Sequence, residues 1–167
     1  FAETIGGRLE RSLFGTCINP LGTLYSPLAL AAILERALDG RPFGEDEFFL
    51  HQELWRHFDA HSSLAATRLD QSVANANRQL DRLRSELRGC DRILITLGSA
   101  WIYRDRETGR DVAHNHKLPL ERFDRRLVQA EDAADRLERT LQKIRQANPN
   151  ARTLITVSPV RHLRDGL

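Results

Sequence analysis

The sequence predicts an α/β domain with parallel strands, from two apolar runs and the helical patterns between them. Residues 93–97 and 153–157 are short, apolar and rich in β-branched side chains, and each run opens into a polar loop. Such unbroken runs are typical of strands that are covered on both faces, as in a parallel sheet. The order strand, helix, strand predicts a right-handed crossover between parallel neighbours.

Residues 2–14 are predicted to form the first helix, because their apolar positions recur at helical spacing. Gly6 and Gly7 each lower helix propensity by about 1 kcal/mol, so we expect close packing at this point. The apolar stripe consists of Ala2, Ile5, Leu9 and Leu13.

The following segment predicts a strand, a loop and a second helix. Residues 16–18 form a short strand candidate, and Pro20 places the next residues in a loop. The second helix begins at Ser26, a hydroxyl N-cap residue, with Pro27 in its first turn. Gly40 ends it.

Two short strands and a long helix are predicted for the middle of the chain. Residues 48–51 and 54–58 are rich in aromatic side chains and have the composition of two paired strands. Residues 67–88 carry apolar side chains at alternating steps of four and three, which predicts a helix with a single seam.

A hairpin and a fourth helix lie between the two apolar runs. Residues 101–103 continue into a turn at 105–109, and the return strand carries alternating Val112, His114 and His116. The helix is expected over 130–147, ended by an Asn-Pro-Asn segment.

Composition excludes some classes of partner. The chain has 167 residues, which corresponds to one domain, with 25 basic and 23 acidic side chains and a net charge of +2. This balance gives no basis for a nucleic-acid partner. No apolar run approaches the roughly 18 residues of a membrane span, and no cofactor is predicted. The sequence leaves the oligomeric state open.

Two further features concern compartment and completeness. Cys17 and Cys90 are expected to be free buried thiols, which favours a reducing compartment such as the cytoplasm. The chain starts at Phe1, contains no methionine and stops in the turn-like Asp165-Gly166-Leu167. We therefore expect a single domain over 1–167 that is incomplete at both ends.

Five segments, in this order and spacing, resemble the GSCFA domain family, which is named for a Gly-Ser-Cys-Phe-Ala signature. Phe1-Ala2 would be the last two letters of that signature. The resemblance covers nearly the whole chain. The segments are residues 1–6, 19–27, 96–103, 116–119 and 156–162.

The resemblance implies a fold and a reaction. The GSCFA family is related to the SGNH hydrolases, so it implies a three-layer α/β/α, flavodoxin-like fold with a mostly parallel sheet, here with a small β-hairpin insertion. It implies an acyl-ester hydrolase whose nucleophilic serine would lie in a Gly-Ser-Cys just before Phe1. The general-base histidine would lie in an Asp-x-x-His past Leu167. A sheet that lacked its first strand would leave unpaired backbone groups, in line with an incomplete chain.

The resemblance also assigns candidate site residues. Gly22 would donate a backbone N–H to the oxyanion, and the Ser99 hydroxyl would replace the asparagine expected in a Gly-x-Asn block. His162 follows the second apolar run, at the edge where ligands of open α/β sheets bind, and is the third catalytic candidate. Tight turns explain the glycines equally well. The substrate-binding candidates are Asn19, His61, Gly98, Trp101, His116, Lys117 and Arg161.

A metal centre is a weaker hypothesis. The chain has six histidines, but zinc needs three or four converging ligands and nothing in the spacing fixes such convergence, so no metal is predicted. His114 departs from the Asn-Cys expected before His116, and a structural role is favoured for His51 and His57.

The predicted function is therefore a serine-dependent acyl-ester hydrolase. By family analogy, its substrate is an acylated carbohydrate or cell-envelope molecule. One alternative is an acyltransferase that uses the same serine with a sugar hydroxyl as acceptor. The other is a non-catalytic module in which Trp55, Trp101 and Tyr103 bind a glycan or a protein, although such aromatics are more often core residues.

Overall fold

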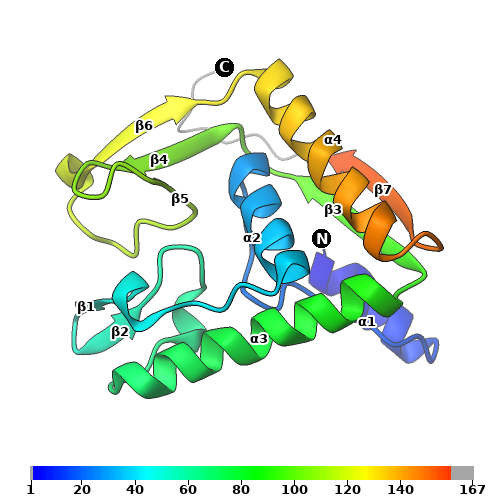
Figure 1. Ribbon diagram of the computed structural model, residues 1–167, viewed down its shortest axis with the longest axis horizontal. Helices are drawn as coiled ribbons and strands as arrows, with labels where there is room; N and C mark the ends of the chain where they lie inside the picture. Colours follow the sequence, from blue (N-terminus) through cyan, green and yellow to red (C-terminus); the bar gives the residue numbers. More distant parts are fainter. Residues whose placement is uncertain (1, 159–167) are drawn as a thin grey trace.

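The computed structural model describes residues 2–158, which form a mixed α/β chain with three small sheets (Figure 1). The helices are α1 (Ala2–Arg11), α2 (Pro27–Asp39), α3 (Leu69–Gly89) and α4 (Ala130–Ala147), with single 3₁₀ turns at Glu45–Glu47, Ser62–Leu64 and Leu120–Arg122. The strands are β1 (Phe49–His51), β2 (Leu54–Arg56), β3 (Arg92–Leu97), β4 (Trp101–Asp105), β5 (Asp111–Val112), β6 (Phe123–Leu127) and β7 (Arg152–Val157).

The two apolar runs pair as expected. β3 and β7 are parallel neighbours, with Ile95 opposite Ile155. Ile95 is buried in the core, but the opposite face of the pair is open, because Leu94 and Leu154 are 54 % and 55 % exposed. The prediction that both faces are covered is therefore wrong for the described residues. These residues contain one parallel pair of strands, so they do not show the expected three-layer α/β/α arrangement.

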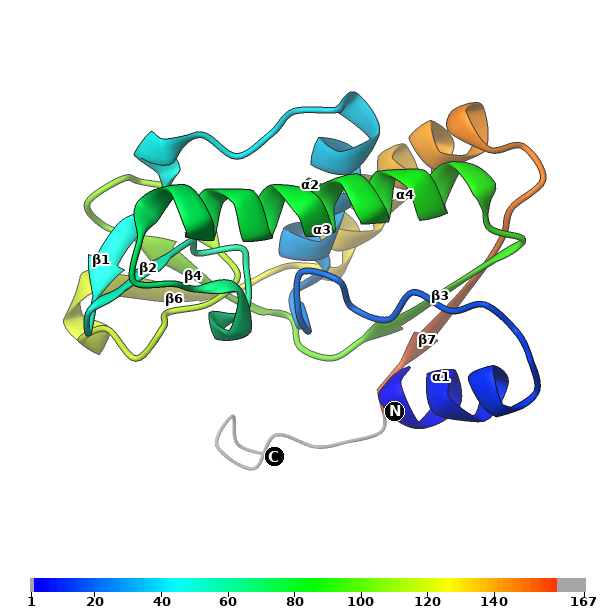
Figure 2. The ribbon, with the colours of Figure 1, turned by 90° about the horizontal axis from the view of Figure 1, so that it is seen from below.

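The core is organised around α2. This helix packs against both α3 and α4, and Figure 1 shows it near the middle of the molecule. In Figure 2, α3 and α4 lie on one side of the β3–β7 pair and α1 on the other. The core side chains come from these helices, from β3 and from the loops around them. They include Leu21, Ile33, Leu34, Phe43, Ala60, Leu80, Ile95 and Ile144.

The bounds of α2 follow from its sequence. Pro27 is its first residue, where a missing N–H costs nothing. Gly40 ends the helix in the left-handed region, with φ of 64°, and donates its backbone N–H to the carbonyl of Ala37. Ser26 occupies the N-cap position, but its hydroxyl makes no capping hydrogen bond.

The segment after α1 differs from its prediction. Residues 16–18 are not a strand, because among the described residues none lies beside them in a ladder. They are held instead through side chains. Thr16 Oγ1 donates to Glu10 at 2.5 Å, and Ile18 packs on Gly6 so closely that a Cβ there would lie 2.0 Å from Ile18 Cδ1. This contact explains Gly6 but not Gly7.

The hairpin is also larger than its prediction. β4 lies between β5 and β6, all antiparallel, and β6 was not predicted. The return strand β5 is only two residues long, so His114 and His116 lie in a loop rather than on a strand. Ion pairs link the three strands. They include Arg106 with Asp124 and Arg126 with Asp111, and in each the guanidinium nitrogen lies 2.5 Å from a carboxylate oxygen.

Candidate functional site: one loop joins the predicted motifs

The loop between Asn19 and Ser26 contacts two of the predicted motifs. At one end, Gly22 lies against His61. At the other, the Tyr25 carbonyl accepts the backbone N–H of Ser99 at 3.1 Å. Three residues of chain span at most about 11 Å, so this loop brings the His61 segment and the Gly98-Ser99 turn into one neighbourhood.

Gly22 is required by packing. Its φ of 100° lies in the region that favours glycine, and a Cβ there would lie 2.3 Å from His61 Cβ. The His61 N–H donates to the Leu21 carbonyl at 2.8 Å, which holds the two segments together. The Gly22 N–H itself donates to the Asn19 carbonyl at 2.7 Å. The tight-turn explanation is thus sufficient for Gly22, and an oxyanion role would share or release that hydrogen bond.

Asn19 makes the turn that contains Gly22. It has a φ of 42°, which asparagine tolerates better than most residues. Its side-chain Nδ2 lies 3.5 Å from Thr23 Oγ1, a long contact that leaves the amide able to serve another acceptor. The predicted binding role of Asn19 remains a hypothesis with compatible geometry.

The Gly98-Ser99 turn presents a hydroxyl. Ser99 Oγ accepts the backbone N–H of Trp101 at 3.1 Å. A hydroxyl that accepts through its oxygen keeps its hydrogen for a second partner, so the geometry is compatible with Ser99 as an oxyanion donor. Gly98 is explained by contact, since a Cβ there would lie 3.2 Å from Tyr25 Cδ1.

Three histidines lie together beside Gly22. The ring centroids of His61 and His114 are 6.4 Å apart, and those of His114 and His116 are 5.7 Å apart. Burial, followed by the nearby His116 and His61, lowers the pKa of His114 to about 4. Burial is also the main cause that lowers the pKa of His116. Both imidazoles are therefore neutral at pH 7.

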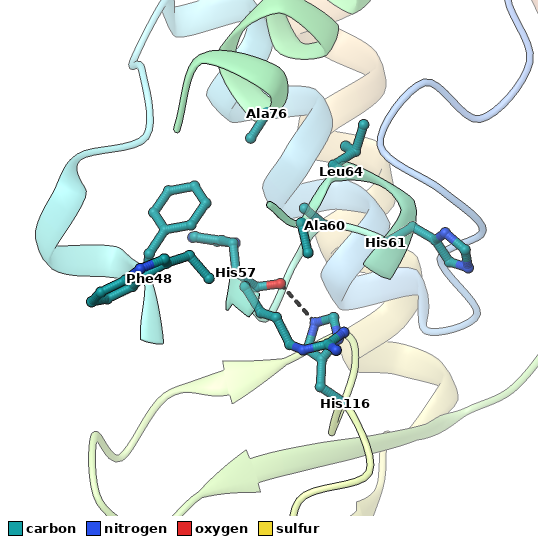
Figure 3. A pocket seen from close by; sticks show the side chains of 10 residues that line it. Phe48, His57, Ala60, His61, Leu64, Ala76 and His116 are labelled. Atoms are coloured by element: carbon teal, nitrogen blue, oxygen red, sulfur yellow. Dashed lines mark hydrogen bonds between the residues drawn. The ribbon is translucent and has the colours of Figure 1, made fainter. Parts of the chain in front are cut away.

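The hydrogen bonds fix which ring nitrogens are open. His116 Nε2 donates to the His57 carbonyl at 2.8 Å (Figure 3), so in the neutral ring Nδ1 carries the lone pair. His61 Nδ1 accepts the Ser63 N–H at 3.2 Å, so its Nε2 carries the hydrogen. His114 Nε2 is buried without a hydrogen-bond partner among the described residues. The group thus offers acceptors as well as donors.

His116 and Lys117 share an uncommon backbone. Their φ values are 49° and 61°, both in the left-handed region. The Leu118 N–H donates to the Asn115 carbonyl at 2.9 Å, so the pair forms a tight turn, and Gln52 and Glu53 between β1 and β2 have the same left-handed backbone. Lys117 is exposed beside His116.

The pocket drawn in Figure 3 is small. It measures about 10 Å³, which is the room that one water molecule needs, and His57, His61 and His116 are among its lining residues. In Figure 3 the His61 ring points away from Ala60 and Phe48. Any substrate would therefore meet the outer side of the histidine group rather than this pocket.

The described residues provide neither a metal site nor a reactive thiol. Within residues 2–158, no three or more histidine, cysteine, aspartate or glutamate side chains are placed to hold a metal ion. Cys17 and Cys90 are free and half-buried, and burial raises the pKa of both thiols, which disfavours a reactive thiolate.

The predicted site residues fall into three groups. Those brought to the 19–26 loop, directly or through a neighbour, are Asn19, Gly22, His61, Gly98, Ser99, Trp101 and His116. Lys117 is adjacent but exposed, and Arg161 and His162 lie outside the described residues. Sequence reasoning missed Tyr25 as the backbone partner of Ser99, and it did not predict that His114 lies between His61 and His116.

Comparison with known proteins gives one match. The sequence pattern of the GSCFA family matches residues 1–167, the whole chain. No curated protein and no solved structure matches.

Proposed function

We propose that this chain, which belongs to the GSCFA family, is part of a serine-dependent acyl-ester hydrolase. The proposal includes the three-layer α/β/α, SGNH-like architecture and a nucleophilic serine from a Gly-Ser-Cys segment before Phe1. The proposed substrate class is an acylated carbohydrate or cell-envelope molecule, and the proposed compartment is the cytoplasm. The structure has no helix able to cross a membrane among the described residues.

One observation carries the proposal. The loop that contains Gly22 touches both the His61 segment and the Gly98-Ser99 turn, so motifs far apart in sequence meet around eight residues of chain. A packing explanation accounts for the glycines, but it does not account for the Ser99 hydroxyl at one end of this loop and the rings of His61, His114 and His116 at the other.

The proposed reaction uses these groups in two steps. The serine oxygen bonds to the ester carbonyl carbon and its proton passes to a general-base histidine, while the carbonyl electron pair moves to oxygen. The Ser99 hydroxyl donates to that oxyanion. Collapse expels the alcohol, which takes the proton, and water then cleaves the acyl-enzyme by the same route. His162 and Arg161, which follow β7, are proposed to act at this site.

The test uses the full-length protein. It is expected to hydrolyse p-nitrophenyl acetate and to be labelled by a fluorophosphonate probe at the serine of the Gly-Ser-Cys segment. Ser99→Ala is expected to lower kcat by roughly 10²-fold, the effect of losing one oxyanion donor. Ser12→Ala, an exposed serine at the end of α1, should leave kcat unchanged. Absence of both labelling and turnover would refute the proposal.

A transferase would be recognised in the same assay. If product release accelerates when a sugar alcohol is added and the sugar becomes acylated, water is not the preferred acceptor. The hydrolase proposal would then give way to the acyltransferase with the same serine. If the serine is absent and a glycan binds, the non-catalytic module is correct.

A further inference from the structure

Among the described aromatic side chains, Phe14 and Tyr25 are the exposed ones, and Tyr25 lies at the candidate site. Phe14, just after α1, is 63 % exposed, and Tyr25, in the loop before α2, is 53 % exposed. A single exposed aromatic ring is common in proteins, so the position and the support of Tyr25 decide what it can do.

Tyr25 is held from two directions beside Ser99. Its backbone carbonyl accepts the Ser99 N–H at 3.1 Å. A Cβ added to Gly98 would lie 3.2 Å from Tyr25 Cδ1, so the tyrosine ring lies close to the glycine backbone. The next residue, Ser26, is buried as the N-cap residue of α2. An exposed ring that is already fixed in place loses little conformational freedom when a ligand packs on it.

The Tyr25 ring is also unused within the described part of the chain. No ring, cation or hydrogen-bonding group there is paired with its side chain. The aromatics that the sequence offered for glycan binding are engaged instead. The guanidinium carbon of Arg125 stands 4.1 Å above the Trp101 ring, and Tyr103 meets a phenylalanine ring with centroids 5.9 Å apart. Tyr25 is therefore the better candidate for contact with a ligand.

The surroundings of Tyr25 are rich in uncharged polar groups. The loop that contains it and the two segments that this loop contacts lie in stretches without aspartate, glutamate, lysine or arginine, although these make up 29 % of the chain. The exposed Lys117 follows His116, at the opposite, Gly22 end of the loop. Acidic ligands are usually held by arginine or lysine, so this end of the loop favours an uncharged ligand. The uncharged stretches are residues 12–34, 60–67 and 93–103.

A sugar ring matches this combination of groups. One face of a pyranose carries C–H groups that pack on an aromatic ring, and its rim carries hydroxyls. The Ser99 hydroxyl and the Asn19 amide can both hydrogen-bond such hydroxyls. A bare acyl chain in the same place would remove water from these polar groups without replacing their hydrogen bonds, which is unfavourable.

We propose that Tyr25 is the platform on which the uncharged pyranose ring of the substrate packs, next to Ser99. This narrows the substrate class to an acyl ester of a neutral sugar. The inference rests on the proposed function for the cleavage of that ester, but binding of the sugar is measurable without turnover.

The first test uses two acetate esters and the full-length protein. Methyl glucoside acetylated at its primary hydroxyl and ethyl acetate present the same acyl group, but the first alone has a sugar ring. Tyr25→Ala is expected to lower the ratio of kcat/KM for the sugar ester to kcat/KM for ethyl acetate about tenfold, through KM. Tyr25→Phe keeps the ring and should retain the ratio.

Two further variants make this test specific. Phe14→Ala removes the other exposed aromatic ring and should leave the ratio unchanged. Tyr25→Leu keeps an apolar side chain against Gly98 without an aromatic face, so it tests the same point if Tyr25→Ala does not fold. A ratio that Tyr25→Leu and Tyr25→Ala leave unchanged would overturn the proposal.

An NMR titration with methyl glucoside separates this inference from the hydrolase proposal. The full-length protein should bind this sugar, and Tyr25→Ala should weaken binding about tenfold. If no ester is turned over while this binding and its dependence on Tyr25 are observed, only the hydrolase proposal falls. Tighter binding of methyl glucuronide or glucose phosphate would show a site for charged sugars and would overturn the proposal. Equal competition by benzyl alcohol would show a site for flat rings in general and would also overturn it.

Discussion

At the scale of single residues, Gly22 is the position where the site tolerates least change. We expect Gly22→Ala to lower the free energy of unfolding by about 3 kcal/mol. The new Cβ meets His61 Cβ at 2.3 Å, and alanine is strained at a φ of 100°. Urea unfolding followed by circular dichroism measures the loss.

Gly109 provides the matched control for backbone strain. It also has a positive φ, 66°, but an added Cβ would meet nothing within 4 Å. Gly109→Ala should therefore cost only about 1 kcal/mol. Equal losses in the two variants would show that strain alone, and not the His61 contact, makes Gly22 necessary.

His114 should make stability depend on pH. Its pKa falls from 6.5 to about 4 in the folded chain because it is buried beside His116 and His61. The unfolded chain therefore binds more protons between these values, so stability is complete above pH 6.5 and is lost as pH falls towards 4. The full effect is on the order of 3 kcal/mol.

The measurement compares unfolding at pH 7 and pH 4.5 for the parent chain and for His114→Gln. The variant should lose less stability on acidification, although it begins with a modest penalty from its changed packing. His51→Gln is a suitable control, since it replaces another histidine that lies outside the His61–His114–His116 group. An unchanged pH profile in His114→Gln would contradict the prediction.

The candidate site shows what residue chemistry can and cannot indicate. Gly22, Gly98 and Asn19 were singled out by type and motif, and all lie at or against the same loop. The partnership of Tyr25 with Ser99 could not be predicted, because it uses a backbone carbonyl that any residue would offer. The contact of His114 with His61 could not be predicted either, because it depends on the fold rather than on sequence spacing.

At the scale of secondary-structure elements, a buried charge joins α2 to α4. Glu35 accepts hydrogen bonds from Arg136 at 2.6 Å and from Thr140 at 2.8 Å. Thr140 is fully buried, so Glu35→Ala leaves its hydroxyl with only the Arg136 carbonyl. We expect a loss of about 2–3 kcal/mol in the free energy of unfolding, measured by urea titration.

A second ion pair between the same two helices is the control. Lys143 contacts Asp39 at 3.0 Å, but both side chains are largely exposed. Asp39→Ala should therefore change stability by less than about 1 kcal/mol. Glu35→Gln keeps an oxygen for Thr140 and should fall between the two variants. If Asp39→Ala lowers the free energy of unfolding as much as Glu35→Ala does, burial does not explain the difference expected between the Lys143–Asp39 and Arg136–Glu35 ion pairs.

Elements with strong periodicity were predictable and those held by charge were not. α4 covers the predicted range 130–147, and α3 differs from its prediction by only two residues at its start and one at its end. β6 was missed because Phe-Asp-Arg-Arg-Leu lacks an alternating apolar pattern. Its place depends on cross-strand ion pairs, Arg106 with Asp124 and Arg126 with Asp111, which sequence spacing does not reveal.

At the scale of the whole molecule, the open face of the β3–β7 pair is the main departure from the sequence prediction. Apolar runs indicate burial but not which part of a protein supplies the cover. Leu94 and Leu154 are direct neighbours across the pair and are both more than half exposed on this face. Contiguous apolar surface of this kind binds hydrophobic dyes and promotes association.

The isolated chain should enhance the fluorescence of anilinonaphthalene sulfonate, and the double variant Leu94→Thr with Leu154→Thr should reduce the enhancement at least about twofold, because it breaks the patch at its centre. Stability should change little, since threonine suits strands and both positions are half exposed. Leu50→Thr makes the same replacement at a side chain that is 57 % exposed in β1, away from the β3–β7 pair, and should leave the fluorescence unchanged. The proposed three-layer architecture adds a second requirement, that the full-length protein binds less dye per molecule than the isolated chain. If the full-length protein and the isolated chain bind equal amounts of dye, the β3–β7 face is uncovered in both, which contradicts the three-layer architecture.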